Sequence, residues 1–141
     1  MSIYADSSFF VSLYVPDQHT SEARRRVASR PALWMTPLHV AEWAHAIEQQ
    51  VFRGSASRRE ADRTIQLFQD DRSQGLWKEA ALPDRAFEVC TQLAHQYAAR
   101  LGVRTLDTLH VACALELQAD QFWTFDQRQA KLARAAGLRA R

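Results

Sequence analysis

The sequence predicts an α/β fold in which helices flank a mostly parallel central sheet. Short apolar runs that suit buried strands alternate along the chain with segments whose apolar residues recur at helical spacing. The segments between the runs are long enough to carry the chain back across a sheet, so successive strands should run in the same direction. The chain has 141 residues, 47% of them hydrophobic, which suffices for a sizeable core. We therefore expect a single domain over residues 1–141.

The first third of the chain predicts two strands and three helices. An apolar run ends at Asp6, and apolar residues at helical spacing follow it. Pro16 and Pro31 should stop the helices that precede them, because proline lacks the backbone N–H that a helix needs. The expected elements are a strand over 3–5, a helix that starts near 9 and stops before 16, a helix over about 20–29, a strand over 33–35 and a helix over 37–52.

The rest of the chain continues this alternation. Ser57 and Glu60 have the spacing of a capping box, which satisfies free backbone N–H groups at the start of a helix. Gly75, Gly102 and Gly137 each follow a helical pattern and should end it. The expected elements are a helix from 57 to before 75, a strand over 76–82, a long helix from 84 to 102, a buried helix over 109–117, a strand over 122–125, a helix over 131–136 and an edge strand over 138–140.

Four acidic residues are the candidate functional residues: Asp6, Glu42, Asp107 and Asp126. Asp6 and Asp126 end predicted strands, and parallel sheets bind ligands at the carboxyl ends of strands where the strand order switches. Two carboxylates about 4 Å apart repel by roughly 4 kcal/mol at an effective dielectric near 20, and a divalent cation would remove that penalty. Oxygen ligands of this kind suit Mg²⁺ or Mn²⁺. The five histidines lack HExxH spacing and cysteine partners, so no zinc site is expected.

Each acid also has a structural interpretation. Asp6 and Asp126 precede helices and can serve as N-caps, whereas Asp107 can be stabilised by a helix dipole. Glu42 lies opposite the apolar stripe of its helix, which fits either solvent or a cleft. His110 follows Asp107 by one helical turn, so it can approach the site or be a hydrogen-bonded structural residue.

Composition and motifs exclude several classes of protein. There is no glycine-rich phosphate loop, no GxSxG motif and no cysteine with a convincing base. Cys90 and Cys113 lie in apolar helical patterns and should be buried free thiols, as expected in a reducing compartment. No stretch approaches the roughly 20 apolar residues of a membrane span, and no signal peptide is evident. These observations predict a cytoplasmic protein.

The basic residues are almost all arginine, since only Lys78 and Lys131 are lysines. Arginine binds phosphate with two parallel hydrogen bonds and stacks on bases, so a nucleic-acid partner is permitted. A coding bias toward arginine, or solvated helix faces, would explain the same excess. Candidates for the rim of an acidic site are Arg24, Arg25, Arg26, Arg58, Arg59 and Arg104.

Several stretches together resemble the PIN-domain family, in particular its VapC-type toxins. The resemblance spans the whole chain and is carried by Tyr4-Ala5-Asp6-Ser7-Ser8, by Glu42, by residues 104–112 (RTLDTLHVA), by Phe122-Trp123-Thr124-Phe125-Asp126 and by Ala136-Gly137-Leu138. The family usually has threonine where this chain has Ser7, and often alanine where it has Thr108. The resemblance implies a three-layer PIN-like sandwich with four or five short strands and about seven helices.

The resemblance also implies a function. Proteins of this group are Mg²⁺- or Mn²⁺-dependent endoribonucleases acting on tRNA, rRNA or mRNA, commonly homodimers, and each is held inactive by a cognate antitoxin. Asp6 and Asp107 would be direct metal ligands, Asp126 a ligand or a support, and Glu42 a ligand or an orienter of the attacking water. Ser8 and Thr124 match small polar positions near the site, and Arg104 is the candidate for substrate binding.

Two other functions remain open from the sequence. In a catalytically silent binding module, the acids would cap helices and the surface would bind RNA or a protein. A phosphatase or phospho-receiver would also place an aspartate at the carboxyl end of a parallel strand. Such proteins, however, usually pair that aspartate with a second acid or have a lysine at the end of a later strand. This chain has Ser7-Ser8 after Asp6 and no strand-end lysine.

Overall fold

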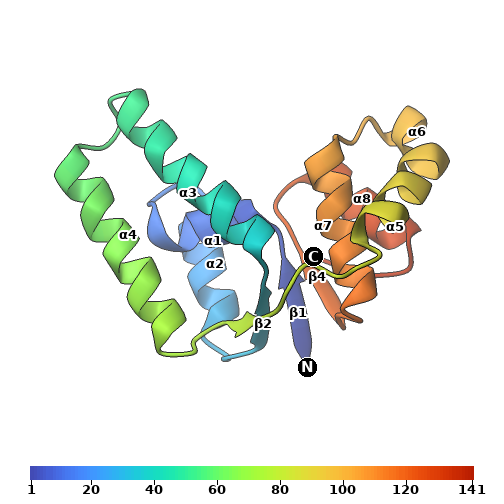
Figure 1. Cartoon of the computed structure of the whole chain (residues 1–141), viewed down its shortest axis with the longest axis horizontal. Coiled ribbons are helices and arrows are strands. Elements are labelled where there is room, and N and C mark those ends of the chain that lie inside the picture. The colour runs from blue at the N-terminus through green and yellow to red at the C-terminus, as the bar shows by residue number, and fades with distance from the viewer.

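The computed structural model describes all residues from Met1 to Arg141 and contains one five-stranded sheet (Figure 1). The strand order is β3-β2-β1-β4-β5, and all four pairings are parallel, as the sequence predicts. The strands are β1 (Ser2–Ala5), β2 (Ala32–Met35), β3 (Lys78–Glu79), β4 (Gln121–Trp123) and β5 (Arg139–Ala140).

Seven helices connect the strands, because α5, η1 and α6 form one continuous helix with a π-helical turn in its middle. They are α1 (Ser7–Tyr14), α2 (Thr20–Val27), α3 (Pro37–Phe52), α4 (Arg58–Ser73), α5 (Ala86–Leu93), η1 (Ala94–Ala98), α6 (Ala99–Leu101), α7 (Thr105–Glu116) and α8 (Gln127–Ala135). Gly102 ends α6 with a φ of 68°, a left-handed conformation that glycine adopts without steric cost. No helix is long and apolar enough to cross a membrane.

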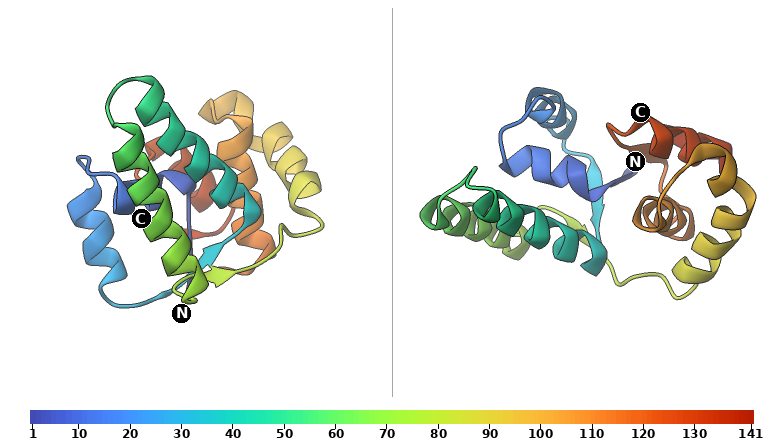
Figure 2. Two further views of the ribbon diagram at one scale, coloured as in Figure 1. Left: turned by 60° about the vertical axis from the view of Figure 1, so that its left-hand side comes forward. Right: turned by 90° about the horizontal axis from the view of Figure 1, so that it is seen from above.

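The helices form two layers around the sheet, and this confirms the predicted three-layer sandwich. Figures 1 and 2 show α1 to α4 on one side and α5 to α8 on the other. Alternate residues of β1 enter different hydrophobic clusters: Ile3 and Ala5 pack with the first helical layer, and Tyr4 packs with the second. This alternation follows from the two-residue period of a strand.

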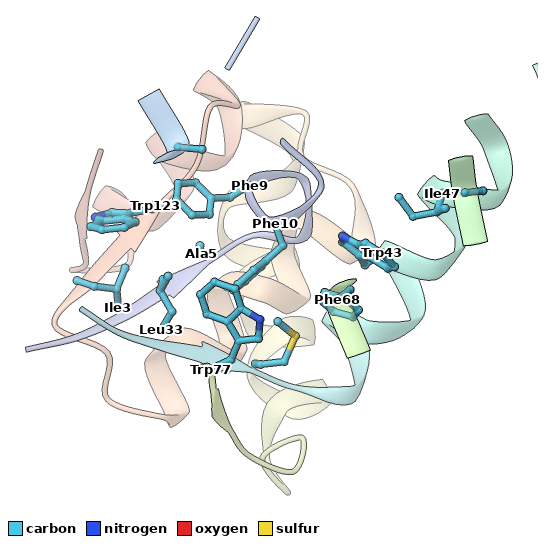
Figure 3. Packing of buried hydrophobic residues seen from close by; sticks show 13 residues of the cluster. Ile3, Ala5, Phe9, Phe10, Leu33, Trp43, Ile47, Phe68, Trp77 and Trp123 are labelled. Atoms are coloured by element: carbon cyan, nitrogen blue, oxygen red, sulfur yellow. The ribbon is translucent and has the colours of Figure 1, made fainter. Parts of the chain in front are cut away.

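Aromatic residues dominate the core on the α1 to α4 side (Figure 3). Trp43 of α3 stacks on Phe68 of α4 with ring centroids 3.9 Å apart, and Phe10 of α1 meets Trp77 edge-on at 5.3 Å. Trp43 directly follows Glu42 in the chain. The packing of its indole therefore fixes the rotation of α3 and, with it, the direction in which Glu42 leaves the helix.

Some predicted boundaries are wrong, each for a local reason. The strand predicted over 76–82 pairs only at Lys78 and Glu79, because it is an edge strand whose Trp77 is a core residue of the helical layer. The last strand before Asp126 ends at Trp123 rather than at 125. Helix α8 starts at Gln127, four residues earlier than predicted, because the Asp126 side chain accepts hydrogen bonds from its first backbone N–H groups.

The strand order switches between β1 and β4, so the ends of these two strands lie side by side. The backbone N–H of Asp6, just after β1, donates to the carbonyl of Trp123 at the end of β4 (3.1 Å). In parallel sheets this is the place where ligands bind. The fold therefore brings Asp6 close to the Thr124–Asp126 segment.

A buried histidine links the start of α3 to the end of β1 by hydrogen bonds. His39 is the third residue of the helix, where a capping box usually has Glu or Gln. Its Nδ1 accepts from the backbone N–H of Thr36 (3.0 Å), and its Nε2 donates to the carbonyl of Ala5 (2.7 Å). Burial lowers the pKa of His39 to about 3, assisted by repulsion from His110 and opposed by the Ala5 carbonyl. The ring is therefore neutral in the folded chain at neutral pH.

The neutrality of His39 predicts a loss of stability in mild acid. The unfolded chain binds a proton at this histidine below about pH 6.5 and the folded chain does not, so the free energy of unfolding should fall by about 2 kcal/mol between pH 6.5 and pH 5. Urea unfolding at several pH values measures this. A His39→Gln variant, which lacks the titrating ring, should show a correspondingly shallower dependence, and parallel curves for the two proteins would contradict the assignment.

Candidate active site

Asp6 is a buried carboxylate held between the ends of β1 and β4. It is 7% exposed and caps α1, with Oδ1 accepting from the backbone N–H of Phe9 (3.1 Å). Its Oδ2 accepts from the hydroxyls of Ser8 (2.8 Å) and Thr124 (3.3 Å). Burial raises the pKa of Asp6 above its ordinary value, although attraction to His110 and these hydrogen bonds oppose the shift. The site thus contains a carboxylate whose charge is poorly compensated by the protein.

Asp126 is exposed and caps α8 in the same way. Its Oδ1 accepts from the backbone N–H groups of Arg128 (2.8 Å) and Gln129 (3.0 Å), and Oδ2 has no hydrogen-bond partner in the chain. Asp6 and Asp126 therefore both cap helices, as one of their two sequence interpretations predicted. It leaves acceptor capacity on both side chains, so capping and ligand binding are compatible.

The buried Thr124 hydroxyl connects these two acids. It accepts from the backbone N–H of Asp126 (3.0 Å) and lies within hydrogen-bond distance of Asp6 Oδ2 and of Gln129 Oε1 (2.7 Å). Gln129 in turn donates from Nε2 to the backbone carbonyl of Asp107 (3.2 Å). One chain of hydrogen bonds therefore joins β1, β4, α8 and α7.

Asp107 lies in the first turn of α7, and its carboxylate makes no hydrogen bond or ion pair with the chain. It lines a hollow of about 470 Å³ together with Asp126, Gly102, Arg104, Gln127 and Arg128. We call this the arginine hollow. Arg104, the candidate for substrate binding, thus lies beside two of the four acids.

Glu42 is held by a buried histidine. Its Oε1 accepts from the Ser7 hydroxyl (2.8 Å) and from His110 Nε2, and His110 Nδ1 bonds to the Tyr4 hydroxyl (2.8 Å). Burial disfavours the ionised form of Glu42, but the hydrogen bonds from His110 and Ser7 prevail and its pKa lies below the ordinary value. Oε2 has no partner in the chain. His110 is therefore a buried, hydrogen-bonded residue that also contacts a candidate acid, so both of its sequence interpretations describe it.

A second hollow lies on the other side of Asp126. It measures about 490 Å³ and contains Glu42, Asp126 and Ser8 in its wall, with Ser7, Val11, Ser12, Asp17, His19, Ala46 and Phe125. We call this the aromatic hollow. Asp126 lines both hollows, Glu42 lines this one and Asp107 lines the other, while Asp6 is hydrogen-bonded to Ser8 in the wall of the aromatic hollow.

The chemistry of the donors fits a hard divalent cation. All four acids offer oxygen, and Asp6, Asp107 and Asp126 form no ion pair with Arg, Lys or His. As placed, however, no group of three or more Asp, Glu, His or Cys side chains converges closely enough to hold an ion. The donors suit Mg²⁺ or Mn²⁺ by their type and uncompensated charge, whereas the close convergence of the acids that the sequence led us to expect is not seen.

The other five predicted rim arginines line neither hollow, although the guanidinium of Arg26 lies 5.3 Å from the centroid of the Phe125 ring. Arg25 and Arg26 bind Glu22, and Arg58 binds Glu48 and Asp62. Arg24 lines a different, largely apolar hollow. Sequence reasoning overlooked Ser7, Arg128 and Gln129. Only Ser7, adjacent to Asp6, carried a signal, because the side chain of a residue that follows a strand end can face the site.

Solved structures share this fold. VapC20 of Mycobacterium tuberculosis, described as a toxin that cleaves the sarcin–ricin loop, is 17% identical with a TM-score of 0.71 over 96% of this chain and 95% of its own. VapBC2 of Rickettsia felis, solved with a DNA fragment from its promoter, is 13% identical with a TM-score of 0.69 over 100% and 98%. FitAcB of Neisseria gonorrhoeae is 14% identical with a TM-score of 0.70 over 98% and 95%.

No curated protein matches the sequence. The family model described as PIN domain, by contrast, matches residues 3–135, which include all four acids and nearly every element of the sheet. The chain therefore belongs to the PIN domain family.

Proposed function

We propose that this protein is a divalent-cation-dependent endoribonuclease that hydrolyses RNA phosphodiester bonds. The observation that carries the proposal is a set of carboxylates without cationic partners in a PIN domain, Asp6, Asp107 and Asp126, whose segments are linked by hydrogen bonds through Thr124 and Gln129. The similarity in fold to a toxin that cleaves the sarcin–ricin loop supports RNA as the substrate class.

Asp6, Asp107 and Asp126 would hold the cation, with Glu42 contributing through Oε2. Such an ion supplies positive charge that stabilises the negative charge developing on the phosphate oxygens and makes water a better nucleophile. The remaining work falls to the residues of the chain, which must orient a water molecule, bind the phosphate backbone and keep the acids in place.

Glu42 is placed to orient the attacking water. Oε1 is occupied by Ser7 and His110, so Oε2 is the oxygen that can accept a hydrogen bond from water. The hydrogen bonds are satisfied when a neutral His110 carries its proton on Nε2, because Nε2–H then donates to Glu42 and Nδ1 accepts from the Tyr4 hydroxyl. His110 would thus act as a positioning residue for Glu42.

Arg104 and Arg128 would bind the RNA backbone. Both line the arginine hollow with Asp107 and Asp126. A planar guanidinium can bind a phosphate with two hydrogen bonds and offset the repulsion between RNA and the acids.

We further propose, on the resemblance to VapC-type toxins, that the protein is the cytoplasmic toxin of a type II toxin–antitoxin pair. A cognate antitoxin would hold it inactive, and two copies would form a homodimer. Residues 1–141 would then act as one catalytic domain per protomer.

The first test is cleavage of total cellular RNA by the purified protein with Mg²⁺ or Mn²⁺. Asp6→Asn and Asp107→Asn should each lower the cleavage rate by at least about a hundredfold, since they remove a proposed ligand and a charge. Asp84→Asn, a change at an exposed aspartate outside both hollows, should not. Undiminished cleavage in excess chelator would refute the proposal.

The second test measures cation binding without catalysis. Because burial raises the pKa of Asp6, its charge destabilises the fold, so Asp6→Asn should be more stable than wild type in chelator at neutral pH. Asparagine also keeps the helix cap. Mg²⁺ at ten times its Kd should stabilise the wild type by about 1.4 kcal/mol and the variant by less. A silent module with purely capping acids would show no cation effect in thermal unfolding.

The third test concerns His110. Its replacement in His110→Ala should lower kcat by about 10- to 100-fold, because Glu42 would lose its orienting partner. In a Glu42→Gln background the same change should have little further effect on kcat, since the two residues act as one unit. Additive losses in the double variant would show that His110 does not act through Glu42.

A further inference from the structure

Three aromatic rings form a stack that leads from the core to the aromatic hollow. Phe9 is fully buried, and Phe125 lies nearly parallel to it at 19° with ring centroids 5.8 Å apart. His19 lies on Phe125 with centroids 4.2 Å apart and an interplanar angle of 4°. Phe125 and His19 are half-buried. His19 is therefore the outermost ring of a stack anchored in the core.

The stack forms a wall of the aromatic hollow, in which Glu42 and Asp126 also lie. Phe125 directly precedes Asp126 in the chain, so the wall and a proposed cation ligand are positioned by the same segment. A molecule stacked on His19 would lie in the same depression as the proposed reacting groups.

The backbone holds His19 in place, while its ring remains available. The backbone N–H of His19 donates to Asp17 Oδ1 (2.7 Å), and Asp17 Oδ2 accepts from the Ser12 hydroxyl (2.8 Å). The imidazole nitrogens of His19 have no hydrogen-bond partner in the chain. One face of the ring packs on Phe125 and its nitrogens make no hydrogen bond, so the ring is pre-ordered, which lowers the entropic cost of binding on it.

The charges of the two hollows suit different parts of an RNA substrate. The arginine hollow contains Arg104 and Arg128, whereas no Arg or Lys lines the aromatic hollow, and Arg26, which lies over the Phe125 ring, is paired with Glu22. A phosphate would be repelled by Asp17, Glu42 and Asp126 in the aromatic hollow. A neutral planar group suits it, and nucleobases stack on aromatic side chains whatever their sequence.

We propose that His19 is the stacking platform for one unpaired nucleobase of the substrate, on a nucleotide adjacent to the scissile phosphate. The inference rests on the proposed ribonuclease activity and adds a base-binding subsite to it. It requires a single-stranded or looped RNA, because a base within a duplex cannot leave its neighbours without a cost in stacking and pairing.

The test uses a short single-stranded RNA that spans a cleavage position mapped on total RNA, and a series of the same RNA with one abasic nucleotide near that position. His19→Ala should lower kcat/KM about tenfold on the intact RNA, the loss expected for one stacked base. On the RNA that is abasic at the contacted nucleotide, wild type and His19→Ala should be equal. His19→Phe should restore most of the activity on intact RNA.

The control is His95→Ala, which changes an exposed histidine of η1 that lines neither hollow and should leave kcat/KM unchanged. An unaltered kcat/KM in His19→Ala, or an equal loss on intact RNA and on every abasic RNA, would overturn the subsite while leaving the nuclease standing. Absence of cleavage by the wild type would instead refute the proposed function, and the subsite with it.

Discussion

The burial of one carboxylate at the strand-order switch is the constraint on which the rest of the site depends. Asp6 follows β1 and is enclosed by the Thr124 segment after β4, so its oxygens have to be satisfied locally. The donors come from its own helix N-terminus, from Ser8 and from Thr124, and none of them is a cation. A buried charge stabilised only by hydrogen bonds is costly. In the proposed function, a bound divalent cation would offset this cost.

The buried polar groups beside the acids are linked to one another by hydrogen bonds. Tyr4, His110 and Glu42 form one hydrogen-bonded row between the sheet and the two helices α3 and α7. His39 lies beside this row, with its ring centroid 5.0 Å from that of His110, and remains neutral. Because His39 is neutral, it adds no positive charge beside the hydrogen bond between His110 and Glu42.

The periodicities of the sequence predicted the layers of the fold, the parallel sheet and the order of its elements, because burial on one face dictates those periods. The sequence also predicted that Asp126 lies near Asp6, since both residues come after strands that the topology places side by side. The role of His110 did not follow, because a histidine one turn after Asp107 has two equally physical partners until α3 is placed. The start of α8 was missed since its first turn, residues 127–130, has little apolar signal and depends on the Asp126 cap.

The position of Asp126 between two hollows of opposite character has a consequence for the shape of any bound strand. In the proposed binding mode, a polynucleotide with a phosphate beside Arg104 and a neighbouring base on His19 would have to bend away from regular helical geometry as it passes Asp126. Regular helical RNA resists such a bend, and a loop or a frayed end does not. The enzyme would then select its target by the local pliability of the RNA, and a tightly folded region would escape scission even if it carried the same bases.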